Sequence, residues 1–160
     1  MSTDRLSART VSPEAMKAVM SVATYIQRSG LEKSLTELVA MRASQINGCA
    51  FCLDQHSRDA RRSGETEQRL YLLDAWHESS LYSPRERAAL AWTDAVTRIA
   101  DTHAPDALYE ELRGHFSDKE IVDLTVLVGL TNLWNRLAIG LRYQHATDSA
   151  KAACGQWAVR

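Results

Sequence analysis

Apolar residues recur along most of this chain at the three- and four-residue spacing that amphipathic helices show. No stretch alternates apolar and polar residues at every second position, as a half-buried strand would. The pattern therefore predicts an all-α, single-domain helical bundle of about six or seven helices. The predicted helices cover 12–29, 34–46, 49–64, 67–76, 83–99, a shorter segment that starts at Pro105, and 117–143.

Two of these helices have strong start signals. Ser83 with Glu86, and Ser117 with Glu120, have the spacing of a capping box, in which each side chain bonds the other residue's backbone N–H. The last helix is apolar on nearly every side, so we expect it to be central and buried. The polar start 1–11 and the end 146–160 are predicted to be flexible arms around a core of 12–145.

Length and charge narrow the functional classes. A chain of 160 residues fits one domain and can bury a core without disulfide staples. The net charge of −1 comes from interspersed acidic and basic residues, which excludes a basic surface for nucleic acid. The first ten residues lack the apolar core of a signal peptide. The longest apolar run is too short, and too interrupted by polar residues, to span a bilayer. We therefore expect a cytoplasmic protein with neither nucleic acid nor membrane as a partner.

The candidate chemistry lies in the stretch 37–64. Cys49 and Cys52 form a C-x-x-C, His56 follows, and Glu37 precedes the first cysteine by twelve positions. Asn47-Gly48 is expected to end one helix, so that the cysteines start the next. A helix N-terminus carries partial positive charge and lowers the pKa of a cysteine placed there. Three cysteines, an odd number, argue for reactive thiols rather than a disulfide framework.

The spacing also predicts how the four residues meet. Cys49 and Cys52 are one helical turn apart, which is close enough for a disulfide. Cys52 and His56 are i, i+4 neighbours on one helix face. In an antiparallel hairpin Glu37 lies about 13 Å of helix rise before the turn and His56 about 10 Å after it, so the two should be nearly level. We therefore predict a proton relay from glutamate through histidine to cysteine.

This arrangement, Glu-x11-Cys-x2-Cys-x3-His, resembles the alkylhydroperoxidase-D-like (AhpD-like) members of the carboxymuconolactone decarboxylase superfamily. The runs 45–49 (QINGC) and 132–136 (NLWNR) are also similar to that family. The strong part of the resemblance covers about a quarter of the chain. At Phe51 the chain departs from the family's best-studied peroxidases, which carry histidine there, and this change is expected to slow peroxide turnover or alter the substrate.

The resemblance implies an antioxidant peroxidase that reduces hydroperoxides without haem, metal or another cofactor. Cys52 would attack the peroxide, Cys49 would close the disulfide, and Glu37 would act as base through His56. An external dithiol would restore the thiols, and the chain would form a homo-oligomer, a trimer or a hexamer. Helix position alone would instead favour Cys49 as the attacking thiol.

Other interpretations of the same residues stay open. The chain could be a general thiol-disulfide oxidoreductase or a redox-sensing oligomeric protein, or a structural subunit whose thiols are idle. Cys49, Cys52, His56 and Glu37 could also ligate zinc. The lactone decarboxylases of the superfamily lack the dithiol. Trp134 is expected in the core, Asn135 and Arg136 would need polar partners if buried, and Cys154 is expected to be a bystander.

Overall fold

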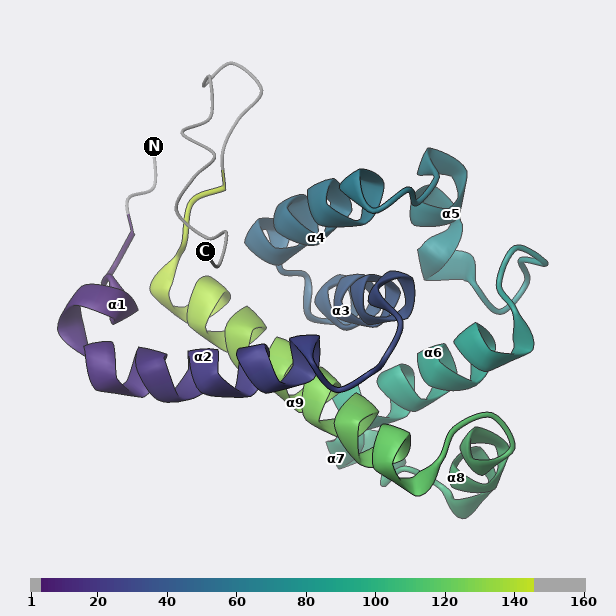
Figure 1. Cartoon of the computed structure of the whole chain (residues 1–160). Coiled ribbons are helices and arrows are strands. Elements are labelled where there is room, and N and C mark those ends of the chain that lie inside the picture. Colours follow the sequence, from purple (N-terminus) through teal and green to yellow (C-terminus); the bar gives the residue numbers. More distant parts are fainter. Residues whose placement is uncertain (1–3, 146–160) are drawn as a thin grey trace.

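A computed structural model describes residues 4–145 of the chain, which fold as one all-helical domain (Figure 1). The all-α prediction is confirmed, and the described part has more helices than the six or seven expected, because it also contains two helices of four residues. The helices are α1 Ala8–Val11, α2 Pro13–Gln27, α3 Lys33–Asn47, α4 Ala50–Arg62, α5 Glu67–Leu72, α6 Pro84–Thr97, α7 Ile99–Thr102, α8 Asp106–Arg113 and α9 Asp118–Leu141, with a 3₁₀ turn η1 at Leu73–Ala75.

Helix starts follow the predicted capping chemistry. Both capping boxes are present, with the Ser83 and Ser117 side chains accepting from the third helical N–H and the two glutamates returning the contact. The Thr66 hydroxyl caps α5 by accepting from the Arg69 N–H, without a returning glutamate. These local bonds satisfy N–H groups that would otherwise lack partners, so each start is fixed by three or four residues of sequence.

Three segments differ from the pattern-based prediction. The expected helix 83–99 ends at Thr97, and a separate turn of helix, α7, follows. The expected helix 67–76 tightens to 3₁₀ geometry after Leu72. The start of the chain is not a loose arm throughout, since α1 forms at 8–11 and Arg5 donates its backbone N–H to the Leu141 carbonyl at 2.8 Å. The predicted arm 146–160, with Cys154, lies outside the described residues.

Helices α3, α6 and α9 form the centre of the bundle. One apolar cluster joins α2, α3, α6, α8 and α9 around Val39, Ala89 and Leu124, which are all fully buried. A second joins α3 and α6 to α4, α5 and η1 around Leu38, Leu73 and Leu90. Because α3 contributes to both clusters, it is held from two sides, and it carries Glu37 one turn after its start.

Helix α9 is central but not buried on every side, which corrects the expectation from its composition. It extends across the bundle from α8 to the N-terminal segment (Figure 1). One outer stripe of the helix faces solvent in the single chain. It consists of Val122, Gly129, Leu133 and Gly140, which follow one another at intervals of seven, four and seven residues. By length and composition alone α9 could cross a membrane, but the core helix of a soluble protein passes the same test.

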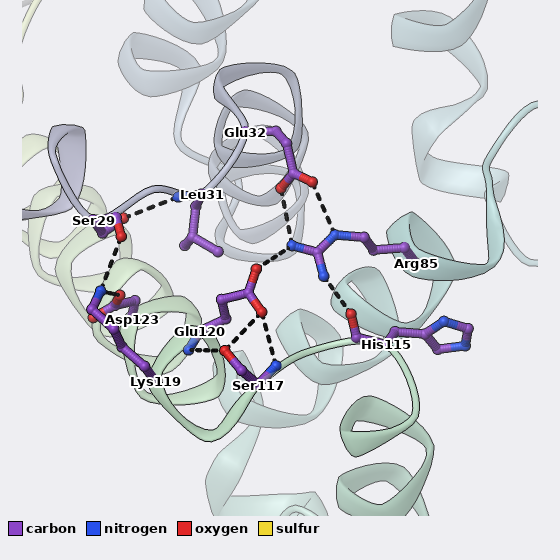
Figure 2. Close-up of polar contacts among 9 residues, drawn as sticks. All are labelled: Ser29, Leu31, Glu32, Arg85, His115, Ser117, Lys119, Glu120 and Asp123. Atoms are coloured by element: carbon purple, nitrogen blue, oxygen red, sulfur yellow. Dashed lines mark hydrogen bonds and ion pairs between the residues drawn. The ribbon is translucent and has the colours of Figure 1, made fainter.

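A charged cluster fixes the start of α9 (Figure 2). Arg85 of α6 pairs with Glu32 before α3 at 3.0 Å and with Glu120 of α9 at 2.6 Å. The same guanidinium also donates to the His115 carbonyl and lies over the Phe116 ring. One arginine therefore joins three elements at the end of the bundle opposite the N-terminal segment.

Candidate active site

The turn between α3 and α4 is built by a glycine in the left-handed conformation. Gly48 has a φ of 66° and donates its N–H to the carbonyls of the last turn of α3, and Cys49 donates to the Ser44 carbonyl at 3.0 Å. Any other residue would be strained at this φ. The tight turn makes Cys49 the N-cap residue of α4, which confirms the predicted placement of the C-x-x-C.

Cys49 and Cys52 are joined as a disulfide, with their Cα atoms 5.4 Å apart. Cys52 donates its backbone N–H to the Cys49 sulfur at 3.3 Å, so this sulfur occupies the position that a capping oxygen normally takes. The partial positive charge of the α4 N-terminus favours a thiolate here once the disulfide is reduced. Both cysteines are almost fully buried, with exposures of 1% and 5%.

Glu37 and His56 face each other across the hairpin. The Glu37 Oε2 atom lies 2.9 Å from Nδ1 of His56, and the two side chains are 15% and 29% exposed. An ionised carboxylate can only accept, so Nδ1 carries the proton and Nε2 of a neutral ring is left as an acceptor. His56 is one turn after Cys52 on α4, so the structure forms two pairs on one hairpin, Cys49 with Cys52 and Glu37 with His56.

The sulfur atoms and the relay have different surroundings. Cys49 and Cys52 pack with Ala138 of α9 and with the rings of Phe51 and Tyr143, which meet edge to face at 5.5 Å. Beyond these rings lies a cavity of about 290 Å³ that is also lined by the segment 4–9. Phe51 therefore covers the sulfurs with an apolar wall, where histidine would have supplied a titratable group.

A buried polar network ties the hairpin turn to α9. Asn135, 1% exposed, donates to the Ser44 hydroxyl at 3.0 Å and accepts from the Asn47 amide at 2.8 Å. Asn47 also donates to Asn132 at 3.0 Å, and Arg136, exposed, donates to the same Asn132 oxygen at 2.8 Å. The two runs that resembled a known family, 45–49 and 132–136, are thus in direct contact.

Sequence reasoning anticipated only part of this network. It flagged Asn135 and Arg136 as needing partners, but it did not identify Ser44 or Asn47 as those partners. The available signal was the Asn-Gly turn beside the first cysteine together with a polar pair inside an apolar helix. Trp134 is partly exposed rather than fully in the core, and it lines a groove of about 450 Å³ beside Glu37 and His56.

The arginines near the site are held in ion pairs. Arg58, Arg61 and Arg62 of α4 form ion pairs with nearby carboxylates, namely those of Asp54, Glu67 and Asp59. Within residues 4–145 no three His, Cys, Asp or Glu side chains are grouped so as to hold a metal ion.

Comparison with known proteins identifies a family and relatives of the chain. The sequence profile of the carboxymuconolactone decarboxylase family matches residues 13–95, just over half of the chain. The uncharacterised protein YdfG of Bacillus subtilis (strain 168) is 43% identical over 137 residues, which cover 86% of this chain and 93% of that protein.

Two solved structures share the fold. A protein of unknown function from Agrobacterium tumefaciens, provisionally assigned as the antioxidant defence protein AhpD, is 51% identical and covers 91% of this chain and all of its own, with a TM-score of 0.89. The debrominase Bmp8 is 21% identical with a TM-score of 0.78, covering 86% of this chain and 74% of its own, and this likeness concerns the fold alone.

Proposed function

The chain belongs to the carboxymuconolactone decarboxylase family, and we propose that it is an AhpD-like, thiol-dependent peroxidase acting through Cys49 and Cys52. One observation carries the proposal: a dithiol pair at a helix N-terminus lies one helical turn from a carboxylate–imidazole pair. Such a combination supplies a nucleophile, a resolving thiol and a route for one proton. The provisional antioxidant assignment of the Agrobacterium relative supports the same activity.

The first step of the proposed cycle reduces the peroxide. His56, held by Glu37, takes the Cys52 thiol proton on Nε2, and the thiolate attacks the terminal oxygen of the hydroperoxide. The S–O bond forms as the O–O bond breaks, leaving a sulfenic acid on Cys52 and an alkoxide. The imidazolium returns the proton to the alkoxide, which leaves as an alcohol. Sulfur loses two electrons and the peroxide gains them.

The next steps restore the thiols. The Cys49 sulfur displaces hydroxide from the sulfenic acid, so that one water is released and the Cys49–Cys52 disulfide forms. An external dithiol then reduces this disulfide by exchange, and its own disulfide leaves. The sum is hydroperoxide plus dithiol giving alcohol, water and disulfide, with no cofactor or metal required.

A general thiol-disulfide oxidoreductase is the second candidate. Phe51 favours it, because the apolar side chain removes the ionisable neighbour that the family's peroxidases carry beside the attacking cysteine. The burial of both sulfurs favours the peroxidase instead, since a hydroperoxide is far smaller than a protein disulfide. The debrominase Bmp8 means that the fold alone does not select between chemistries.

Self-association is part of the proposal. The outer stripe of α9 (Val122, Gly129, Leu133, Gly140) leaves two large apolar side chains in solvent, Val122 at 61% and Leu133 at 40% exposure. Exposed apolar residues aligned on one helix face are typical of an interface. We propose that copies of this chain associate through α9 into a trimer or a hexamer.

The decisive experiment measures peroxide consumption with several dithiol donors. We expect wild type to consume organic hydroperoxide and Cys52→Ser to fall to the uncatalysed rate. Cys49→Ser should complete one turnover, leaving a sulfenic acid at Cys52 that a dimedone probe labels. Cys154→Ser is the matched control and should keep the wild-type rate.

Two results would select the alternatives. Reduction of insulin disulfides without peroxide consumption would identify the general oxidoreductase. Mass spectrometry of the Cys49–Cys52 peptide, taken from reduced protein after mild peroxide treatment, tests whether the thiols are idle, since failure to lose two hydrogens would show that no disulfide forms.

A further inference from the structure

The groove beside Glu37 and His56 has the volume and lining of a site for an organic molecule. It holds about 450 Å³, which is within the range of small-molecule sites. Its walls are mainly apolar side chains from α2, the following loop and α9, namely Ile26, Leu31, Leu127, Leu130 and Trp134. Hydrogen peroxide would leave most of this apolar surface unused.

Polar groups enter the groove mainly along one face of α3. Lys33, Thr36, Glu37 and Ala40 line it at the i, i+3, i+4, i+7 spacing of a single helix face. Lys33 lies at the exposed start of α3, about 6 Å of helix rise from Glu37. His56 closes the groove on the α4 side. The groove therefore has a proton-transfer pair at one position and a cation one helical turn away.

The Lys33 ammonium has no carboxylate partner within residues 4–145. The groove-lining carboxylate, Glu37, is bound to His56, whereas most charged groups around the hairpin are in ion pairs with one another. A cation that is unpaired at the mouth of an apolar groove complements an anionic group on an apolar ligand.

From these contacts we infer that the α2–α3–α9 groove binds amphipathic carboxylates, and that the natural substrate is an organic hydroperoxide with an apolar body and an acid group held by Lys33. The identity of the reacting group rests on the proposed peroxidase function. The binding of the apolar acid does not, and it can be measured separately.

Binding is tested by calorimetric titration of the oxidised full-length protein with dodecanoate and with dodecanol. We expect dodecanoate to bind about three- to fivefold more tightly than dodecanol, and Lys33→Gln to remove that preference. Lys17→Gln, an exposed lysine of α2 outside the groove lining, is the matched control and should keep it. Thr36→Trp places bulk inside the groove and should weaken both ligands. Equal binding of acid and alcohol, or no binding, would overturn the inference.

Turnover is tested with linoleic acid hydroperoxide and its methyl ester. The ratio of their kcat/KM values should favour the acid, and Lys33→Gln should lower this ratio about three- to fivefold through KM, whereas Lys17→Gln should not. If hydrogen peroxide and both lipids are consumed with no preference for the acid, the groove inference fails and the peroxidase stands. If dodecanoate binds as expected but no peroxide is consumed, the proposed function fails and the groove remains a binding site.

Discussion

Single side chains decide whether the hairpin can move a proton. Glu37 orients His56 by holding Nδ1, and the rest of the proposed cycle depends on the imidazole being presented in that tautomer. This pairing could be anticipated, because helix rise alone places residues 37 and 56 level in an antiparallel hairpin. The partners of Asn135 could not, since Ser44 and Asn47 are about 90 positions away and only packing brings them together.

Removing the Glu37 charge should slow the cycle without unfolding the protein. We expect Glu37→Gln to lower kcat/KM for peroxide by about 10² to 10⁴, the usual worth of a positioned acid–base group. Steady-state peroxide consumption measures this effect. Glu110→Gln, an exposed glutamate on α8, is the control. A Glu37→Gln enzyme with the wild-type rate would remove the relay from the mechanism.

Breaking the asparagine network should act on both stability and the disulfide. We expect Asn135→Ala to destabilise the protein by about 1–3 kcal/mol, because the Asn47 amide and Ser44 hydroxyl lose buried partners. Chemical denaturation measures this loss.

The same substitution should also shift the thiol–disulfide equilibrium of Cys49 and Cys52 in dithiothreitol buffers, because the network holds the turn that carries Cys49. Thr93→Ala removes a buried hydroxyl that bonds only its own helix, α6, so it should lower stability and leave this equilibrium unchanged. If Asn135→Ala changed stability alone, the network would be structural and would not position the cysteines.

At the level of whole elements, helix starts were more predictable than helix ends. A few adjacent residues are enough to predict the capping boxes at Ser83 and Ser117 and the left-handed turn at Gly48. The break between α6 and α7 has no such signal. Neither has the solvent-facing side of α9, because an apolar helix face looks the same whether it packs inside the chain or against another molecule.

The charged cluster at the start of α9 should make the fold sensitive to acid. The Ser117 backbone N–H, the Arg85 guanidinium and the Ser117 hydroxyl together lower the pKa of Glu120 from its ordinary 4.5 to about 2. A lowered pKa means that the ionised group stabilises the folded state above pH 4.5, and this contribution is lost as pH falls from 4.5 to 2.

Comparison of thermal unfolding between wild type and Glu120→Gln measures that contribution. The wild-type Tm should be higher by a constant amount from pH 7 to pH 5, and the difference should shrink between pH 4.5 and pH 2. Glu110→Gln should leave Tm near the wild-type value throughout. A Glu120→Gln difference that stayed constant down to pH 2 would mean that the ionisation of Glu120 is not the source of the stabilisation.

At the scale of the whole molecule, the outer stripe of α9 exposes Val122 and Leu133 to solvent within the part of the chain that the structure describes. If copies associate there, Leu133→Glu should place a charge in the interface and reduce the assembly to the 17.9 kDa chain. Light scattering coupled to size exclusion measures the mass. Tyr71→Glu, at an exposed position on α5, should keep the wild-type mass. A monomeric wild type would refute association through α9.

All four candidate residues come from one uninterrupted hairpin of twenty residues, from Glu37 to His56, while the groove walls come mostly from α2 and α9. The hairpin with its four candidate residues can therefore be inherited as one unit, while the surrounding helices change independently. Related proteins could then differ in substrate while keeping the same reactive residues. Replacing the groove-lining residues of α2 and α9 with those of a distant relative should transfer that relative's substrate selectivity, while the hairpin stays unchanged.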